Sequence, residues 1–439
     1  MTLNVERAAA TADLNVLDEL YLHLDREDEP WTVHLEVRAE GTVDEERLEA
    51  AVREAAARHP LARARLADTR ATDVRYRWEI ADGLDEIPLE VADCRDDGEL
   101  AAVRARLLSA TPPLDRPGPF TLALAHLPDG DAIVLNLHHA AGDGMAALRL
   151  MGSIARAYAG EDDPLPEIDP LEVRDVRALV RPGSLGERIT RSRAALDYLA
   201  RGMTPPTRIE SAGATEEPGY GFELIKLGPE EMDRVVARRT GGATVNDVLL
   251  GALAVAVRAW NEGHGADVGT TYLMMPINLR PPEWRFEMVG NYASYVSVQL
   301  ARDDQSGLDA AIAAATGRTR RIKDDGIAGL IVDLFAAPAA LPTAIKKRLQ
   351  DLIPLTVNLA VDTAVLSNLG RLAEVPSMGD AGCVREVWFS PPGRMPLGAS
   401  LGAATLGDEL FLTLRYRHAL LGEDDAREFA ALLHRILVK

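Results

Sequence analysis

Residues 136–144 read Asn-Leu-His-His-Ala-Ala-Gly-Asp-Gly, and the rest of the chain can be organised around this segment. The residues just before it, 133–135, are apolar on both faces of an extended chain, which predicts a central strand from Asp131 to His138. The apolar spacing after Gly144 predicts a helix that continues to about Tyr158. The two histidines therefore lie where a strand ends and a tight loop opens into a helix.

This position suits His139 for chemistry. A strand end presents a side chain from a rigid support, which a general base requires. The small residues of the loop leave room for a substrate, and Asp143 is close enough in sequence to brace the loop. The alternative is an inert pair of histidines that are bonded to the backbone. A metal site is not predicted, because adjacent residues of a strand point to opposite faces and no second ligand cluster follows.

Composition narrows the class of protein. A chain of 439 residues is long for one core, so two lobes are expected. The formal net charge of −20 disfavours a nucleic-acid partner, and the sequence has neither a signal peptide nor an apolar run that could span a membrane. Cys94 and Cys383 stand far apart with no metal-type spacing. These observations favour a cytoplasmic protein, and we expect a monomer.

Helical and strand patterns alternate in both halves of the chain, which predicts an α/β protein. The stretch between the halves, residues 160–219, is rich in proline and charge, as is typical of a connection. We therefore predict an N-terminal lobe over residues 1–175, an interlobe connection over 176–219 and a C-terminal lobe over 220–439.

Further short segments accompany the His-His segment in order along the chain. They are Ala57–Leu61 with Arg63, Pro113–Phe120, Thr244–Leu250, Met275–Pro281 followed by Gly290 and Asn291, and Ser367–Gly370. Together with the pattern His138-His139-x-x-x-Asp143-Gly144, they resemble the motifs of the chloramphenicol acetyltransferase-like superfamily. That superfamily includes nonribosomal peptide condensation domains, wax ester synthases and polyketide-associated acyltransferases.

The resemblance implies a fold and a set of site residues. The fold is a V-shaped pseudo-dimer of two lobes, each a mixed sheet flanked by helices, with an active-site channel between them. His139 is then the catalytic base, and His138, Asp143 and Gly144 support its loop. Asp143 faces away from the substrate and forms a structural ion pair with Arg280. The alternative for Arg280 is an ordinary exposed arginine after a strand.

Four residues of the second lobe are candidates for the substrate channel, namely Asn246, Asn291, Ser367 and Asn368. Asn246, with its neighbour Asp247, can instead cap the helix that follows. Ser367 and Asn368 can instead form a simple turn, and that interpretation competes equally with an oxyanion or acceptor contact.

The resemblance also implies the reaction. The donor is an acyl thioester, acyl-CoA or the phosphopantetheine arm of an acyl carrier protein, and the acceptor is a hydroxyl or amine of a small metabolite. No cofactor is bound permanently. An ordinary histidine pKa near 6.5 would let His139 accept the acceptor's proton and then protonate the departing thiolate.

Basic groups at Arg318–Lys323 and Lys346–Arg348 could contact the donor's phosphates or an acidic carrier, or could be solvated helix faces. The acidic net charge inclines the prediction slightly to coenzyme A.

Three functions remain open at this point. The first is a stand-alone acyltransferase that forms an ester or an amide, moving acyl groups other than aminoacyl groups. The second is a free-standing condensation enzyme that joins carrier-bound substrates. The third is an inactive condensation-like module that recruits partners, against which the intact His-His segment speaks.

Overall fold

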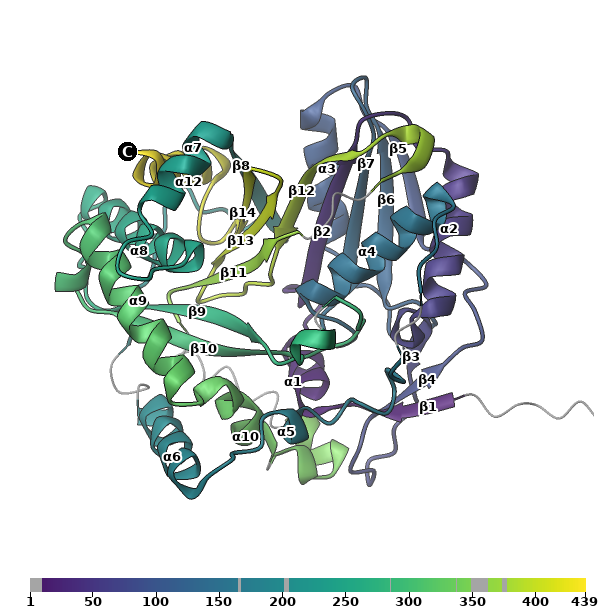
Figure 1. Cartoon of the computed structure of the whole chain (residues 1–439), viewed down its shortest axis with the longest axis horizontal. Coiled ribbons are helices and arrows are strands. Elements are labelled where there is room, and N and C mark those ends of the chain that lie inside the picture. Colours follow the sequence, from purple (N-terminus) through teal and green to yellow (C-terminus); the bar gives the residue numbers. More distant parts are fainter. Residues whose placement is uncertain are drawn as a thin grey trace, which may run out of the picture.

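The computed structural model describes residues 10–164, 167–200, 205–284, 286–336, 338–348, 362–372 and 377–439. Figure 1 shows two lobes side by side, each built on a β-sheet with helices packed against it. The two-lobed α/β pseudo-dimer predicted from the sequence is confirmed.

The first sheet has five strands in the order β12-β2-β7-β6-β5. Their bounds are Val384–Ser390, Thr32–Ala39, Ala132–His138, Phe120–His126 and Leu89–Asp93. β7 lies between β2 and β6 and is buried along its whole length, as its apolar sequence predicts. Ile133 and Leu135 pack into the core that contains α2 (Glu45–Arg58) and α4 (Gly144–Ala159). Val134 packs on the opposite face, beneath α3 (Asp97–Leu108).

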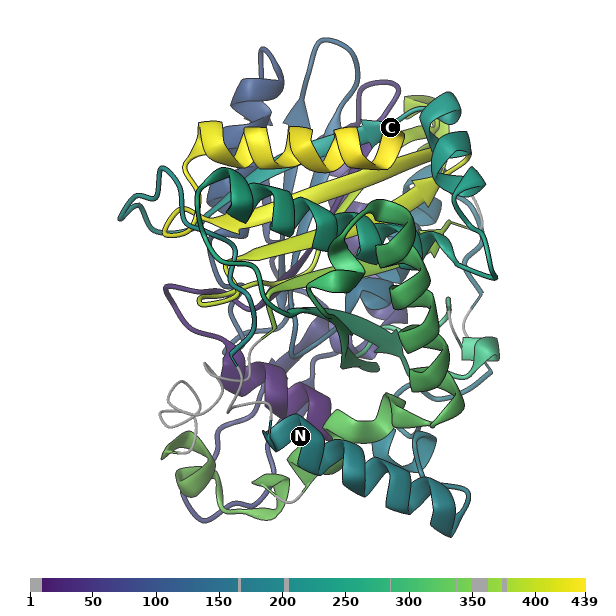
Figure 2. The same cartoon turned by 90° about the vertical axis from the view of Figure 1, so that its left-hand side faces the viewer.

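The second sheet has six strands in the order β10-β9-β11-β13-β14-β8. Their bounds are Ala293–Leu300, Thr271–Asn278, Ala364–Arg371, Ala399–Leu406, Glu409–Arg417 and Tyr220–Leu227. The helices of this lobe are α7 (Pro229–Ala237), α8 (Val245–Gly263), α9 (Leu308–Asp324) and α12 (Glu423–Val438). Figure 2 shows α12 and α8 lying across the outer side of this sheet, and apolar residues of both helices share one core with its strands.

A smaller sheet, β1-β4-β3, lies beside the first lobe, with bounds Ala10–Asp13, Arg77–Ile80 and Ala64–Leu66. The connection between the lobes contains α5 (Val176–Leu179) and α6 (Leu185–Ala200), and α10 (Leu330–Ala336) packs beside them. The helix α1 (Val16–Leu24) follows β1 and is closed at its start by a capping box of Asn15 and Asp18.

The strand β12 comes from the C-terminal segment of the chain but lies in the first sheet. Its residues belong to the segment 220–439, yet it pairs antiparallel with β2 at the edge of the first sheet. β12 then crosses β13 so closely that a Cβ atom on Gly402 would lie 1.8 Å from the carbonyl oxygen of Phe389. The two lobes are therefore joined by a strand of one completing the sheet of the other.

Replacing Gly402 with alanine tests this crossing. The new methyl group can be accommodated only if β12 and β13 separate, and overpacking of this kind costs about 1–3 kcal/mol or more. We expect the free energy of unfolding, measured by urea denaturation, to fall by about 3 kcal/mol.

Gly152→Ala in α4 is the matched control. A Cβ atom at Gly152 meets nothing within 4 Å. Alanine is a better helix former than glycine, so this variant should gain about 0.5–1 kcal/mol. An unfolding midpoint unchanged in Gly402→Ala would contradict the close crossing.

Candidate active site at the lobe junction

The backbone of His139 is fixed from both halves of the chain. Its N–H donates to the carbonyl oxygen of Trp31 at 3.0 Å. Its carbonyl oxygen accepts a hydrogen bond from Nδ2 of Asn291, also at 3.0 Å. One anchor lies just before β2 and the other just before β10, so His139 sits at the junction of the lobes.

The imidazole of His139 lies against α1. The ring of Tyr21 stacks on it with a centroid separation of 4.0 Å, and the hydroxyl of Tyr21 donates to the carbonyl oxygen of Ala293 at 2.9 Å. His139 is only 8% exposed, and its Nδ1 atom has no hydrogen-bond partner among the described residues. Burial lowers the pKa of His139 from 6.5 to about 4. The ordinary pKa expected from the sequence is therefore not met, because α1 removes solvent from the ring.

His138 has different partners. Its Nδ1 accepts a hydrogen bond from the N–H of Ala140 at 3.1 Å, and its Nε2 lies 3.6 Å from a carboxylate oxygen of Asp25. The bond to Nδ1 places the proton of the neutral ring on Nε2, toward Asp25. His138 therefore contacts both the loop and the end of α1.

Asp143 and Arg280 form a buried, two-pronged ion pair between the lobes. Nη1 of Arg280 lies 2.7 Å from Oδ2 of Asp143, and Nη2 lies 2.9 Å from Oδ1. Asp143 also accepts from the N–H groups of Ala146 and Tyr292, so it caps α4 and holds the start of β10. Burial opposes ionisation of Asp143, but the guanidinium and these hydrogen bonds outweigh it and hold the pKa below its usual value. Arg280 is not the exposed arginine of the alternative interpretation.

The two glycines of the His-His segment lie where there is no room for a side chain. A Cβ atom on Gly144 would lie 2.8 Å from Cδ2 of Leu369 and 2.9 Å from the ring of Phe389. A Cβ atom on Gly142 would lie 2.8 Å from Leu137. Gly144 thus allows two elements of the second half of the chain, β11 and β12, to pack against the start of α4.

Asn291 and Asn246, two candidates for the substrate channel, differ in burial, because Asn246 is partly exposed. Asn291 is fully buried, and its amide supports the backbone of His139. Nδ2 of Asn246 lies 3.0 Å from the sulfur of Met275. Asn246 does not cap α8 either, because Thr244 is the N-cap and Asp247 completes its capping box.

Ser367 and Asn368 lie inside β11, where the sequence indicated a turn. The strand is irregular between Asn368 and Arg371, and the side chain of Asn368 accepts from the N–H of Gly370 at 2.8 Å. Gly370 has a φ of 81°, which favours glycine. The simple turn, one of the two alternatives, is therefore wrong, because a bulge inside a strand uses the same residues as a turn. A place for Ser367 and Asn368 in the substrate channel stays a prediction.

The two basic groups are partly occupied by partners within the chain. Lys346 is buried, and its Nζ lies 2.7 Å from a carboxylate oxygen of Glu19. Arg318 pairs with Asp304 at 2.8 Å. Lys346 is thus unavailable to a donor's phosphate, whereas Lys347 and Arg348 are exposed.

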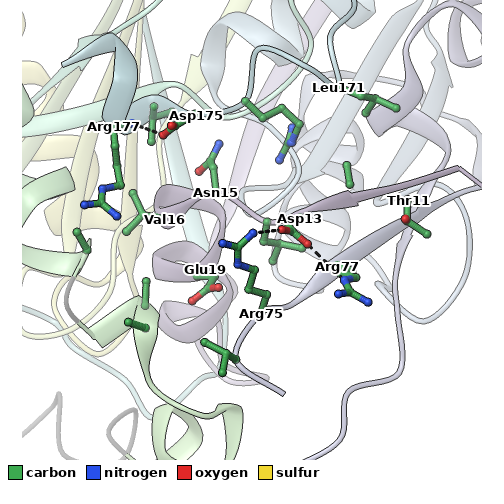
Figure 3. A pocket seen from close by; sticks show the side chains of 18 of the residues that line it. Thr11, Asp13, Asn15, Val16, Glu19, Arg75, Arg77, Leu171, Asp175 and Arg177 are labelled. Carbon is green, nitrogen blue, oxygen red and sulfur yellow. Dashed lines mark hydrogen bonds and ion pairs between the residues drawn. The ribbon is translucent and has the colours of Figure 1, made fainter. Parts of the chain in front are cut away.

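A cavity of about 850 Å³ lies on the other side of α1 (Figure 3). α1 presents Val16 and Glu19 to this cavity and Tyr21 to His139. Asp13 lies between Arg75 and Arg77 in the cavity wall and pairs with both. Most of the charged side chains labelled in Figure 3 pair with oppositely charged residues of the chain. The residues that line the cavity include neither His139 nor Tyr21.

Sequence reasoning missed α1 and its contacts with the site. The helix is nine residues long, and its buried residues include Asp18 and Glu19, so no clear apolar stripe marks it. The available signal was the capping box that begins at Asn15. No sequence pattern indicates that Tyr21 stacks on His139, because that contact depends on the packing of distant elements.

Solved structures of similar fold cover nearly the whole chain. The first condensation domain of the calcium-dependent antibiotic synthetase, in complex with a substrate analogue, aligns with a TM-score of 0.75 and 15% identity, over 98% of this chain and 96% of its own. Trichothecene 15-O-acetyltransferase from Fusarium sporotrichioides aligns with a TM-score of 0.68 and 10% identity, over 100% and 97% of the two chains. A starter condensation domain of rhizomide synthetase, a mutant in complex with C8-CoA and Leu-SNAC, aligns with a TM-score of 0.67 and 15% identity, over 98% and 95%.

The chain therefore has the fold of condensation domains and of this acetyltransferase, as the resemblance of the His-His segment implied. The chain belongs to the same family as the uncharacterized protein Rv2305 of Mycobacterium tuberculosis. The two are 37% identical over 437 residues, which is 98% of this chain and 99% of the relative. No protein-family model matches the chain. Among the described residues, no helix is both long and apolar enough to cross a membrane.

A double-mutant cycle on Asp143 and Arg280 tests the ion pair. Removing one partner of a buried pair leaves the other charge uncompensated, so Asp143→Asn and Arg280→Met should each cost about 3–5 kcal/mol of unfolding free energy. The double variant should cost clearly less than the sum. The exposed pair Glu54 and Arg58 is the control, for which coupling of about 0.3–0.5 kcal/mol is expected.

The pH dependence of the same cycle has a definite sign. Because the pKa of Asp143 is lowered in the folded state, its stabilisation is present above the ordinary aspartate pKa of about 3.9. It is lost as the pH falls through the folded-state pKa. Additive single variants at pH 7 would show that the pair does not couple the lobes.

Proposed function

We propose that the protein is an acyltransferase that moves an acyl group from a thioester to a hydroxyl or amine of a small acceptor, with His139 as the general base. The observation that carries this proposal is the neutral imidazole of His139, held at the lobe junction by backbone bonds from Trp31 and Asn291. A base must be unprotonated to accept a proton, and burial keeps His139 in that form at neutral pH.

The proposed reaction needs no covalent intermediate on the protein. The acceptor's oxygen or nitrogen attacks the thioester carbonyl while its proton passes to the imidazole of His139. The carbon–sulfur bond then breaks, and the imidazolium returns the proton to the departing thiolate. The low pKa of His139 makes the imidazolium a good acid for this second step and a weaker base for the first. Much of the rate would come from holding both substrates together.

The solved structures of similar fold support this reaction class. One is an acetyltransferase that acts on an oxygen of a trichothecene, and another is a condensation domain bound to C8-CoA and Leu-SNAC. These proteins provide precedents on this fold for hydroxyl acceptors and for a coenzyme A thioester. They share 10–15% of their residues with this chain, so the donor and acceptor proposed here rest on the site residues.

A free-standing condensation enzyme is the second candidate, and it differs only in how the substrates arrive. It is favoured by the number of condensation domains among the solved structures of similar fold. The two candidates are separated by intact-mass detection of transfer from one acyl group presented on coenzyme A and on a carrier protein. We expect the coenzyme A thioester to react faster. An acidic carrier protein would need the basic groups of the chain, and salt would weaken that attraction. A faster reaction of the carrier form, with a rate that falls steeply as salt rises, would therefore contradict the preference for coenzyme A.

Replacing His139 with alanine tests the catalytic assignment. We expect transfer to fall by about 10²–10⁴-fold or more, because proton transfer is no longer assisted, while the circular dichroism spectrum stays unchanged. His138→Gln is the control. It should lose activity through weaker support of the loop, with a measurable loss of thermal stability. Wild-type turnover in a folded His139→Ala variant would refute the assignment.

The pH profile tests whether burial sets the pKa of His139. The rate should fall only as the pH drops toward about 4, because the base is lost when His139 is protonated. Tyr21→Ala opens the imidazole to water, so the acid limb of kcat/KM should move up toward pH 6.5. Tyr21→Phe keeps the stacked ring and should leave the limb in place. The same acid limb in all three proteins would contradict this role of Tyr21.

A further inference from the structure

Three arginines gather at the junction of the lobes, outside the machinery described above. Arg415 and Arg417 lie two residues apart on β14, and Arg394 lies in the loop between β12 and β13. They are 1%, 8% and 7% exposed, respectively. The N–H of Arg417 donates to the carbonyl oxygen of Gly398 in that loop, so the loop and the strand are held side by side. Arginine is rarely buried to this degree without a paired carboxylate.

Arg415 and Arg417 are committed to partners within the chain. The guanidinium of Arg415 donates to the carbonyl oxygens of Pro30 and Thr32 and stacks over the ring of Tyr220 at 3.8 Å. Arg417 donates to the carbonyl oxygen of Asp28, and its ring contact with Tyr220 is 4.9 Å. These contacts attach the segment before β2 to the second lobe.

Arg394 has no such partners. Its guanidinium makes no hydrogen bond or close ion pair with any residue that the structure describes. The Nε atoms of Arg415 and Arg417 are sealed from solvent without a partner, whereas the guanidinium nitrogens of Arg394 are not sealed. The guanidinium therefore keeps some contact with solvent, although Arg394 as a whole is 7% exposed.

A partly buried carboxylate accompanies these arginines. Glu29 lies 3.8 Å from Nε of Arg417 and accepts a hydrogen bond from the N–H of Met395. Arg26 adds another positive charge near Arg394, and Asp28 adds a negative charge whose residue is exposed. A poorly solvated positive charge is costly unless an anion pairs with it, and here the guanidinium groups outnumber the carboxylates.

We propose that Arg394 forms a binding site for an oxyanion, a carboxylate or a phosphate, carried by one of the substrates. Guanidinium groups bind both kinds of oxyanion through paired N–H donors. Glu29 lies two residues before Trp31, whose carbonyl oxygen holds the N–H of His139. An anion bound at Arg394 therefore lies beside the segment that fixes the catalytic base. Assigning the anion to a substrate rests on the proposed function, whereas the anion site does not.

Thermal unfolding with simple anions tests the site without any catalytic assay. The probes are sodium phosphate, adenosine 3′,5′-bisphosphate and sodium succinate, each titrated at constant ionic strength with sodium chloride. At least one probe should raise the Tm of the wild-type protein in a saturable way, because a ligand of the folded state stabilises it. A response to the phosphates identifies the donor's phosphate as the source, and a response to succinate alone identifies a substrate carboxylate.

Arg394→Gln should weaken the apparent affinity for that probe by about tenfold or more, since a charge-assisted hydrogen bond is lost. Without anion, the same variant should have a Tm equal to or higher than wild type, because an uncompensated buried charge has been removed. Arg191→Gln is the matched control. Arg191 is 3% exposed but pairs with Asp333, so its loss should lower the Tm and leave the anion response unchanged.

Two outcomes would overturn the proposal. One is a wild-type protein whose Tm responds to none of the three probes beyond the chloride control. The other is an Arg394→Gln variant that responds as strongly as wild type. Failure of the proposed acyl transfer has a separate signature, which is an absence of acylated product by intact mass while the anion response persists.

Discussion

The ion pair between Asp143 and Arg280 is the interaction on which the arrangement of the site depends. Asp143 belongs to the loop after β7 and Arg280 to the segment between β9 and β10, so the pair connects the two sheets directly. Arg280 also donates to the carbonyl oxygens of Met288 and Gly290, and this fixes the chain just before Asn291. Asn291 in turn holds the carbonyl group of His139. A buried charge pair of this kind matters less for its net energy than for its geometry, because the two Nη groups of Arg280 meet Asp143 and both carbonyl groups in one arrangement.

The environment of His139 follows from the same packing. α1 is attached to the start of β10 by Asn15 and Tyr21, which donate to the carbonyl oxygens of Asn291 and Ala293. The ring of Tyr21 therefore covers the imidazole only when the lobes are correctly joined. The solvation of His139, and therefore its pKa, thus depends on the packing of both lobes together.

The sequence predicted the parts of the site that are local and the strands that carry a strong apolar pattern. β7 was recognisable because Ile133, Val134 and Leu135 face two cores, and the loop after it was recognisable from its small residues. Arg280 was named as the partner of Asp143 through a family resemblance. Patterning alone could not have paired residues 137 positions apart. The contacts of Tyr21 and the bulge in β11 were missed, because the first depends on long-range packing and the second uses residues typical of turns.

The path of β12 bears on how the protein is made. β2 and β7 belong to the first third of the chain, yet among the described residues it is 384–390 that pair with the outer edge of β2. While a ribosome synthesises the residues between β7 and β12, the first sheet has an open edge that could pair with another chain. β12 begins about 250 residues after β7 ends, so this length of chain must be synthesised before the first sheet can be completed. The nascent N-terminal half therefore depends on a strand synthesised much later, or on a chaperone, to cover the edge of its own β-sheet.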